Sequence, residues 1–206
     1  MVRPESASLT KENQVKKSKI ETARTRQHII TTAAAEFRRK GVEGIGLSDL
    51  MAKAGLTHGG FYRHFKTKDD LVSEALGSAF PASTHKLDDA MEEIGVKEMI
   101  SDYLSESHRD NRSQGCPFAA LGGELARCDR TVRDKATVSF LKQVKIIAGK
   151  LKSLSPGEAQ KRALVLLSSI AGALNMARVV TDPKFSRAIL QETAKSLQFL
   201  ATRAED

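Results

Sequence analysis

The sequence predicts an all-α protein built from a small N-terminal domain and a larger C-terminal helical bundle. From about residue 25 onward, apolar side chains recur at the three- and four-residue spacing of a helix face. Beyond residue 70 no segment alternates as a strand does, and proline and glycine separate segments of several helical turns each. We expect a flexible basic arm over residues 1–23, a three-helix domain over 24–76 and a bundle over 77–206.

Composition and charge are typical of a globular protein with a basic N-terminus. Hydrophobic residues make up 40% of the chain and charged residues 28%, which excludes a wholly disordered or fibrous protein. Half of the formal net charge of +8 falls in residues 1–26, where seven Lys and Arg side chains accompany three Glu. Such an arm is either a solvated polar tail or a segment that also touches a polyanion.

Other features argue against a membrane, secreted or metal-dependent protein. No apolar run approaches the roughly 20 residues that span a bilayer, and residues 1–14 lack the apolar core of a signal peptide, so we expect a cytoplasmic protein. Cys116 and Cys128 have no CxxC or Cys/His spacing, so no disulfide framework or zinc site is expected. The five histidines are scattered, and we expect no catalytic residues, metal or cofactor.

The first helix of the N-terminal domain is expected over residues 25–40. Its inward face is apolar at helical spacing and consists of Ile29, Ile30, Ala33, Ala34 and Phe37. Three cationic residues at 38–40 and Gly41 form a typical helix end, because cations favour the negative end of the helix dipole and glycine adopts the left-handed cap.

Two short helices follow, joined by a glycine-containing turn. They are expected over residues 48–54 and 58–65, with Ser48 and Thr57 as N-caps and Gly55 just past the end of the first, and a further helix opens at residues 66–70. The helical period directs one apolar set inward: Leu50, Met51, Ala54, Leu56, Phe61 and Phe65. It leaves four residues pointing outward: His58, Gly59, Tyr62 and Arg63. This is the helix-turn-helix arrangement, in which the second helix enters the major groove of DNA.

The remainder of the chain is predicted to be helices separated by five breaks. These breaks are expected at Pro81, Gly95, residues 115–117, residues 156–157 and residues 182–183. Three long helices should cover residues 131–154, 156–180 and 183–203. The middle one is apolar nearly all round over residues 163–174, so it is buried either inside one subunit or at a subunit interface. We expect the last two helices to form a homodimer interface, because they carry more apolar surface than one small subunit should expose.

Residues 47–71, LSDLMAKAGLTHGGFYRHFKTKDDL, closely resemble the tetracycline-repressor (TetR/AcrR) family. The specific part is the Tyr-x-His-Phe-x-x-Lys-x-x-Leu tail, and the likeness is strong over residues 24–76. The resemblance implies a homodimer with an N-terminal domain that binds double-stranded operator DNA and a C-terminal bundle that binds ligand and dimerises. The expected function is a repressor released from a palindromic operator by a small-molecule or electrophile inducer of unknown identity, and activation instead of repression stays open.

The resemblance also implies roles for individual side chains. Tyr62, His64 and Lys68 become contacts to the DNA backbone, while Ser48 and Thr57 bond phosphates from helix starts, where free N–H groups meet an anion. His64 could equally brace the helix from within.

Base reading would fall on His58, Arg63 and Thr57. The family tolerates small residues where Gly59 and Gly60 stand, although each costs roughly 1 kcal/mol in a helix interior. The two glycines either permit close approach of the backbone to DNA or leave the recognition helix poorly ordered until it binds.

An inducer cavity is expected among the helices of residues 84–180, lined or flanked by Cys116. This thiol precedes an expected helix over residues 118–127, a position that can make a thiol reactive. Two interpretations stay open. Cys116 is either an inert buried cysteine or a sensor of electrophiles or oxidants, since some family members with a Gly-Cys at a similar point resemble such sensors. The other candidate wall residues, each with core packing as its alternative, are Phe118, Leu121, Leu125, Phe140, Val144 and Met176.

Two other function classes remain as alternatives. A ligand-independent architectural DNA-binding protein would need no cavity, and more than 120 residues of apolar helix past the first domain argue against it. An enzyme would have to be thiol-dependent and use Cys116, without any catalytic constellation around it. The inducer itself leaves no contiguous motif, because several helices assemble a pocket.

Overall fold

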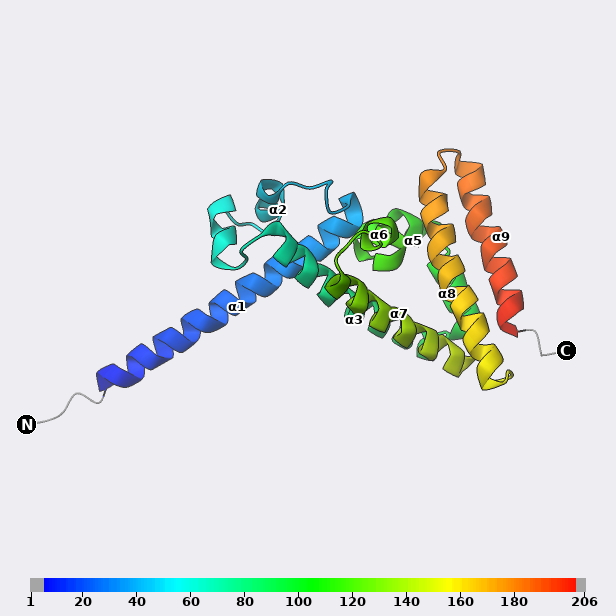
Figure 1. Ribbon diagram of the computed structural model, residues 1–206, viewed down its shortest axis with the longest axis horizontal. Helices are drawn as coiled ribbons and strands as arrows, with labels where there is room; N and C mark the ends of the chain where they lie inside the picture. The colour runs from blue at the N-terminus through cyan, green and yellow to red at the C-terminus, as the bar shows by residue number, and fades with distance from the viewer. Residues whose placement is uncertain (1–5, 203–206) are drawn as a thin grey trace, which may run out of the picture.

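The computed structural model describes the backbone of residues 6–202 and the side chains of residues 19–202, and within these ranges the chain is helical with no strand (Figure 1). The all-α prediction is confirmed. In chain order the elements are α1 (Ser6–Lys40), α2 (Leu47–Lys53), the 3-10 helix η1 (His58–Arg63), α3 (Lys68–Glu93), α4 (Gly95–Tyr103), α5 (Glu106–Asp110), the 3-10 turn η2 (Arg112–Gln114), α6 (Pro117–Leu125), α7 (Arg130–Lys150), α8 (Pro156–Val179) and α9 (Pro183–Thr202).

The first helix is longer than predicted. It begins at Ser6, so the predicted start near residue 25 is wrong, and the helix covers most of the expected arm; residues 1–5 lie outside the described residues. Its N-terminal half projects away from the other helices (Figure 1). The apolar period could not detect this half, because residues 19–24 are all exposed and carry no buried face.

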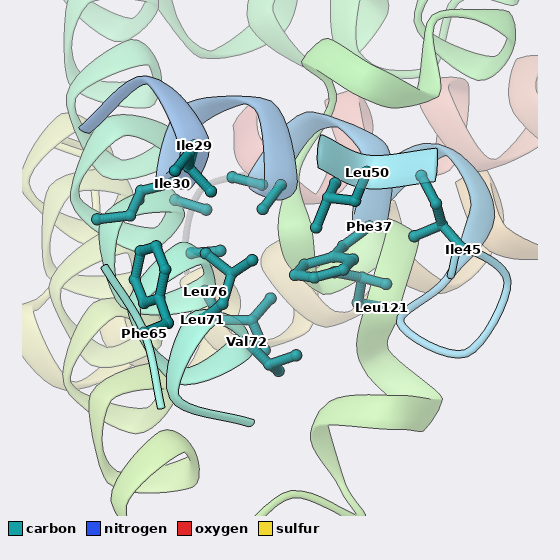
Figure 2. Packing of buried hydrophobic residues seen from close by; sticks show 14 of the residues in the cluster. Ile29, Ile30, Phe37, Ile45, Leu50, Phe65, Leu71, Val72, Leu76 and Leu121 are labelled. Carbon is teal, nitrogen blue, oxygen red and sulfur yellow. The ribbon is translucent and has the colours of Figure 1, made fainter. Parts of the chain in front are cut away.

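The core of the N-terminal domain forms where α1, α2, η1 and the start of α3 meet (Figure 2). Phe37, Leu50 and Phe61 have no exposed surface, and the inward set predicted from the helical period is buried apart from Leu56, which is only partly covered. Leu121 of α6 packs into the same core (Figure 2), so an element of the C-terminal bundle helps to build the N-terminal domain.

The turn after α2 follows the predicted glycine stop. Gly55 has a φ of +70°, its N–H donates to the Ala52 carbonyl at 3.0 Å, and the Leu56 N–H donates to the Met51 carbonyl at 2.9 Å. These two bonds form a Schellman cap, which requires a residue that tolerates the left-handed region. The start of α2 differs from the prediction: Gly46 is the N-cap and Ser48 is the second helical residue.

The second short helix is a 3-10 helix that ends at Arg63, before the predicted end at residue 65. Thr57 is its N-cap, as expected, although its side chain makes no capping bond. The tighter turn places the Gly60 N–H 3.0 Å from the Thr57 carbonyl. Two adjacent glycines favour a short irregular helix here, since both lower the α-helix propensity.

One long helix, α3, crosses two predicted boundaries. It passes through Pro81 without a break, so the predicted interruption there is wrong. Buried side chains on both sides of the proline hold the helix together, among them Phe80 before it and Leu87 after it, and this packing outweighs the one lost backbone bond. Because α3 spans residue 76, the same helix belongs to both predicted domains.

The C-terminal bundle is formed by the rest of α3 and by α4 to α9. Helices α8 and α9 lie side by side at the end of the molecule farthest from the start of α1 (Figure 1). The predicted long helices agree with α7, α8 and α9 to within a few residues. Between α3 and α7, buried polar groups satisfy one another: the Thr84 and Ser139 hydroxyls are 2.8 Å apart, and the Gln143 amide donates to Thr84 at 3.2 Å.

Candidate DNA-binding surface and ligand cavity

The outward face of η1 consists of exposed side chains mounted on a rigid core. Tyr62 is 64% exposed, and the helical-period prediction is confirmed for its outward neighbours, since His58, Gly59 and Arg63 are exposed as well. Directly beneath, the Phe61 and Phe65 rings stack with centroids 5.5 Å apart. The buried aromatic residues therefore fix which way the polar face points.

Three further candidate residues lie beside η1. Ser48 and Thr57 are exposed in the first turn of α2 and at the start of η1, and Lys68 is the partly exposed first residue of α3. A reciprocal capping box fixes that start: the Asp70 N–H donates to the Thr67 hydroxyl at 3.1 Å, and the Thr67 N–H donates to the Asp70 carboxylate at 3.0 Å. The capping box fixes the backbone at the start of α3, from which the Lys68 side chain extends.

His64 is partly buried and is bonded to α1. Its Nδ1 is enclosed without a hydrogen-bond partner among the described residues, and its carbonyl accepts from Nε of Arg26 at 3.4 Å. Burial, helped by the charges of Arg26 and Arg63, lowers the pKa of His64 and so favours the neutral ring. Arg26 also pairs with Glu74, and this ion pair joins α1 to α3. Its guanidinium carbon lies 4.6 Å from the centroid of the Phe65 ring.

The C-terminal bundle holds a cavity of about 320 Å³. Helices α3 and α4 and the segment 105–117 form most of its wall, and single residues of α1, α7 and α8 complete it: Arg38, Gln143 and Leu167. Cys116 lines the cavity and is only 6% exposed. The volume lies at the lower end of the range of ligand pockets, about 300–1,000 Å³.

The other six predicted wall residues do not line this cavity. Phe118 stacks on Phe80, with centroids 5.4 Å apart, and meets Phe140 edge-on at 5.7 Å. Leu121 and Leu125 belong to the core of the N-terminal domain. Val144 belongs to the core of the C-terminal bundle, and Phe140 packs against it. Met176 is 49% exposed on α8. A single helical period cannot tell a cavity wall from a core, because both are buried apolar faces.

The cavity wall contains polar residues that sequence reasoning missed. Arg38, near the end of α1, reaches the wall and donates from Nε to the Ser113 carbonyl at 2.8 Å. Burial lowers the pKa of Arg38, and no carboxylate lies within ion-pair distance of it among the described side chains. The only sequence signal for Arg38 was its place in the cationic helix end, which suggests a solvated residue.

Tyr103 and His108 form the second missed group. Their rings meet edge-on with centroids 4.4 Å apart, and His108 Nδ1 lies 2.8 Å from the Tyr103 carbonyl. The Tyr103 hydroxyl is enclosed with no hydrogen-bond partner among the described residues. Burial, with a smaller effect of the Cys116 thiol, raises the pKa of Tyr103 well above its usual range, so the phenol stays a donor. Burial lowers the pKa of His108.

Side chains of α6 and α8 bond to the end of the N-terminal domain and to the segment 105–117. The carboxylate of Glu124 on α6 accepts the N–H of Val42, just after α1, at 3.1 and 3.2 Å. Arg178 of α8 donates to the carbonyls of residues 108, 109 and 119 and so holds the wall segment in place. These bonds connect α6 to the residue after α1, and α8 to the segment 105–117.

Helices α8 and α9 expose large apolar side chains in this single chain. These are Leu164, Val165, Met176, Val179, Phe185 and Phe199, with exposures from 38% to 68%. By length and composition alone α8 is also the one described helix that could cross a membrane, a test that the core helix of a folded bundle passes as well. Its inward face packs on α7 and α9, as in the core helix of a folded bundle.

A helix-turn-helix with an exposed polar face, joined through one long helix to a C-terminal helical bundle, is the architecture of a DNA-binding transcriptional regulator. The chain belongs to the TetR family of bacterial regulatory proteins. Residues 29–75 match the family's N-terminal domain, and residues 70–195 match the C-terminal domain of LmrA/YxaF-like transcriptional regulators. The chain is thus a transcriptional regulator, a class defined by DNA binding and not by catalysis.

Individual relatives are similar over different lengths. The regulator AcrR of Shigella flexneri is 44% identical over 59 residues, which cover 29% of this chain and 27% of AcrR, so the match spans about a quarter of that relative. The repressor BepR of Brucella suis is 26% identical over 175 residues, covering 78% of this chain and 84% of BepR.

Among solved structures, a TetR-family regulator from Cytophaga hutchinsonii superposes with a TM-score of 0.73 at 25% identity, covering 90% of this chain and 96% of that one. Escherichia coli NemR in its reduced form gives a TM-score of 0.68 at 21% identity, with 84% and 94% covered, and shows the shared fold.

Proposed function

We propose that this chain is a homodimeric, cytoplasmic repressor that binds a palindromic operator and releases it when a small molecule occupies the cavity. The observation that carries the proposal is the pairing of an exposed η1 face with a cavity whose wall includes Arg38, a residue of the DNA-binding domain's own helix α1. A ligand in that cavity touches the domain that it must control.

On DNA, the division of labour follows side-chain chemistry. His58, Arg63 and Thr57 face outward and can reach base edges, whereas the phenol of Tyr62 and the ammonium of Lys68 donate to phosphate oxygens. Ser48 contributes a hydroxyl from the first turn of α2, and His64 acts mainly by holding η1 against α1. The small residues Gly59 and Gly60 let the backbone of η1 approach the duplex.

The dimer interface is formed by the exposed apolar residues of α8 and α9. A homodimer with a two-fold axis requires one self-complementary patch, and the exposed side chains of these two adjacent helices supply it. This patch also explains why α8 is apolar on its outer face without any membrane.

Light scattering tests the dimer. The full chain should have twice the mass of one subunit at micromolar concentration, and Val179→Glu on α8 should produce single subunits. Val138→Glu on α7 is the matched control, because Val138 is 69% and Val179 64% exposed. Single subunits for the wild type, or the same behaviour of both variants, would refute this interface.

Two-fold symmetry in the protein demands a two-fold symmetric operator. The half-sites should lie about 34–36 Å apart, or a multiple of that, because each η1 must meet a successive face of the major groove. Selection of bound duplexes from a random-sequence pool by the full chain tests this. An enriched palindrome supports the proposal, and enrichment of one asymmetric half-site, or none at all, contradicts it.

Ligand control works through differential affinity. The two η1 helices of a dimer must keep one separation to bind both half-sites, and a ligand shifts the dimer away from it only if it binds the other arrangement more tightly. A coupling of about 1–3 kcal/mol would change operator affinity some 5–150-fold.

A thiol-based form of the same response is a second candidate, favoured by the place of Cys116 in the cavity wall. In this form, an electrophile or peroxide that modifies the thiol releases the operator. Cys116→Ser should then abolish the response and preserve basal operator binding. If the serine variant responds like the wild type, the cysteine is structural and the inducer binds reversibly.

A further inference from the structure

Arg38 is a partly buried cation in the cavity wall without a carboxylate to balance it. Its Nε donates to a neutral carbonyl, that of Ser113, and no ion pair to it exists among the side chains of residues 19–202. The next residue shows the ordinary arrangement: Arg39 is exposed and pairs with the carboxylate of Glu36 at 2.5 Å. A charge withdrawn from water is retained where something else compensates it.

The remaining wall groups favour an anion over a cation. Lys86 and Asp102 are exposed residues of opposite charge, so they leave the positive charge of Arg38 unbalanced inside. His108 adds no charge, because burial lowers its pKa. The enclosed Tyr103 hydroxyl, which lies beside the Cys116 thiol, has no hydrogen-bond partner among the described residues and so supplies a free donor.

Apolar side chains supply the rest of the wall. Leu87, Met99 and Leu167 come from three different helices and surround the polar groups with hydrocarbon. At about 320 Å³ the cavity suits a compact body of one or two rings.

We propose that the cavity binds a small aromatic or aliphatic acid, whose carboxylate is the counter-charge of Arg38 and whose apolar body contacts Leu87, Met99 and Leu167. This inference rests on the proposed function, because it names the chemical class of the inducer for the same cavity. The anion contacts α1 directly at Arg38, immediately after Phe37 in the core of the DNA-binding domain. The bound acid would therefore contact the DNA-binding domain directly, through Arg38 of α1.

Calorimetric titration of the full chain with matched acids and amides tests the inference. The probes are benzoate and 2-naphthoate, each beside its carboxamide, which has the same shape without the charge. We expect at least one acid to bind, and its amide to bind at least about tenfold more weakly. Equal affinity of acid and amide, or no binding of either acid at millimolar concentration, would overturn the inference without any variant.

Variants of Arg38 assign the charge. Arg38→Gln keeps a donor for the Ser113 carbonyl and should reduce acid affinity about tenfold while leaving amide affinity unchanged. Arg38→Lys keeps the charge but not the planar guanidinium, so its acid affinity should fall between those of the wild type and Arg38→Gln. Arg39→Gln is the matched control and should behave like the wild type. Unchanged acid binding by Arg38→Gln would overturn the inference.

The inference and the proposed function fail in different ways. If an acid binds through Arg38 but does not release the selected operator duplex, the anion site is supported and ligand-controlled release is refuted. If a neutral molecule releases the operator while the acids do not bind, ligand control stands and the anion site does not.

Discussion

The proposed DNA-binding surface and the cavity of the C-terminal bundle are built in opposite ways. Every candidate DNA contact falls within residues 48–68, one short stretch of the chain. The cavity collects its wall from residues as far apart as Arg38 and Leu167, on α1, α3, α4, α7, α8 and the segment 105–117. The contiguous site leaves a motif in the sequence, whereas the dispersed one exists only once the helices have packed.

The two sites also differ in how their charges are treated. On the proposed DNA-binding surface Arg63 is exposed, so water solvates its charge and the fold loses no stability through it. In the cavity Arg38 and the Tyr103 hydroxyl are withdrawn from water without full compensation. Buried polar or charged groups without partners lower the stability of the fold, and such groups are typical of ligand-binding sites.

The largest effect is expected in the core beneath the DNA-binding surface. Phe61→Ala should lower the free energy of unfolding by about 3–5 kcal/mol, because Phe61 is fully buried. Tyr62→Ala, the adjacent exposed aromatic residue, should change it by less than about 0.5 kcal/mol but weaken DNA binding. Urea unfolding followed by circular dichroism measures both. Similar losses of stability would show that η1 does not separate an inner from an outer face.

That inner and outer division was predictable because it depends on local chemistry alone. The period of the buried residues, the glycine stop at Gly55 and the Thr57 cap all follow from the adjacent sequence. The 3-10 form of η1 and the shifted cap of α2 were not predicted, since propensity does not choose between neighbouring helical registers. Pro81 misled the prediction because the packing of α3 outweighs a local signal.

A smaller effect is expected where the two regions are joined. Glu124→Ala removes the acceptor for the Val42 N–H and should lower the free energy of unfolding by about 1.5–3 kcal/mol. Glu43→Ala, an exposed neighbour of Val42, should change it by less than about 0.5 kcal/mol. The comparison uses urea titration at one pH. Equal effects of the two variants would mean that the α6 contact does not tie the bundle to α1.

The smallest expected effect concerns pH. Burial holds the pKa of His108 below the unfolded value of 6.5, so unfolding takes up a proton in this range and stability falls as the pH drops below about 6.5. His108→Asn keeps a donor for the Tyr103 carbonyl and should flatten this part of the stability profile. Urea unfolding at pH 7.5 and 5.5 measures the slope.

His85 provides the control of opposite sign. It is exposed, and its hydrogen bond to Asp89 raises its pKa, so its contribution is present below pH 6.5 and is lost as the pH rises. His85→Asn should leave the acid-side loss in place or make it slightly steeper, the opposite of the flattening expected for His108→Asn. A steeper acid-side loss in the His108 variant than in the wild type would contradict the account.

The cavity shows why the rest of the site was beyond sequence reasoning. Cys116 was predicted because it precedes a helix start, but six apolar candidates proved to be core or surface residues. Arg38 was assigned to a solvated helix end, and Tyr103 carried no signal at all. Their roles depend on which helices pack together, a long-range outcome that no local pattern contains.

The most direct test compares Arg63→Ala with Lys68→Ala on the selected operator and on a scrambled duplex across a range of salt concentrations. The account predicts that Arg63→Ala loses affinity only for the operator, by about 1–3 kcal/mol per lost base contact. Lys68→Ala should weaken binding to both duplexes and lower the salt slope by about one per subunit, as loss of a phosphate contact does. If both variants lose affinity for the two duplexes alike, the exposed face of η1 does not read sequence and the central claim is wrong.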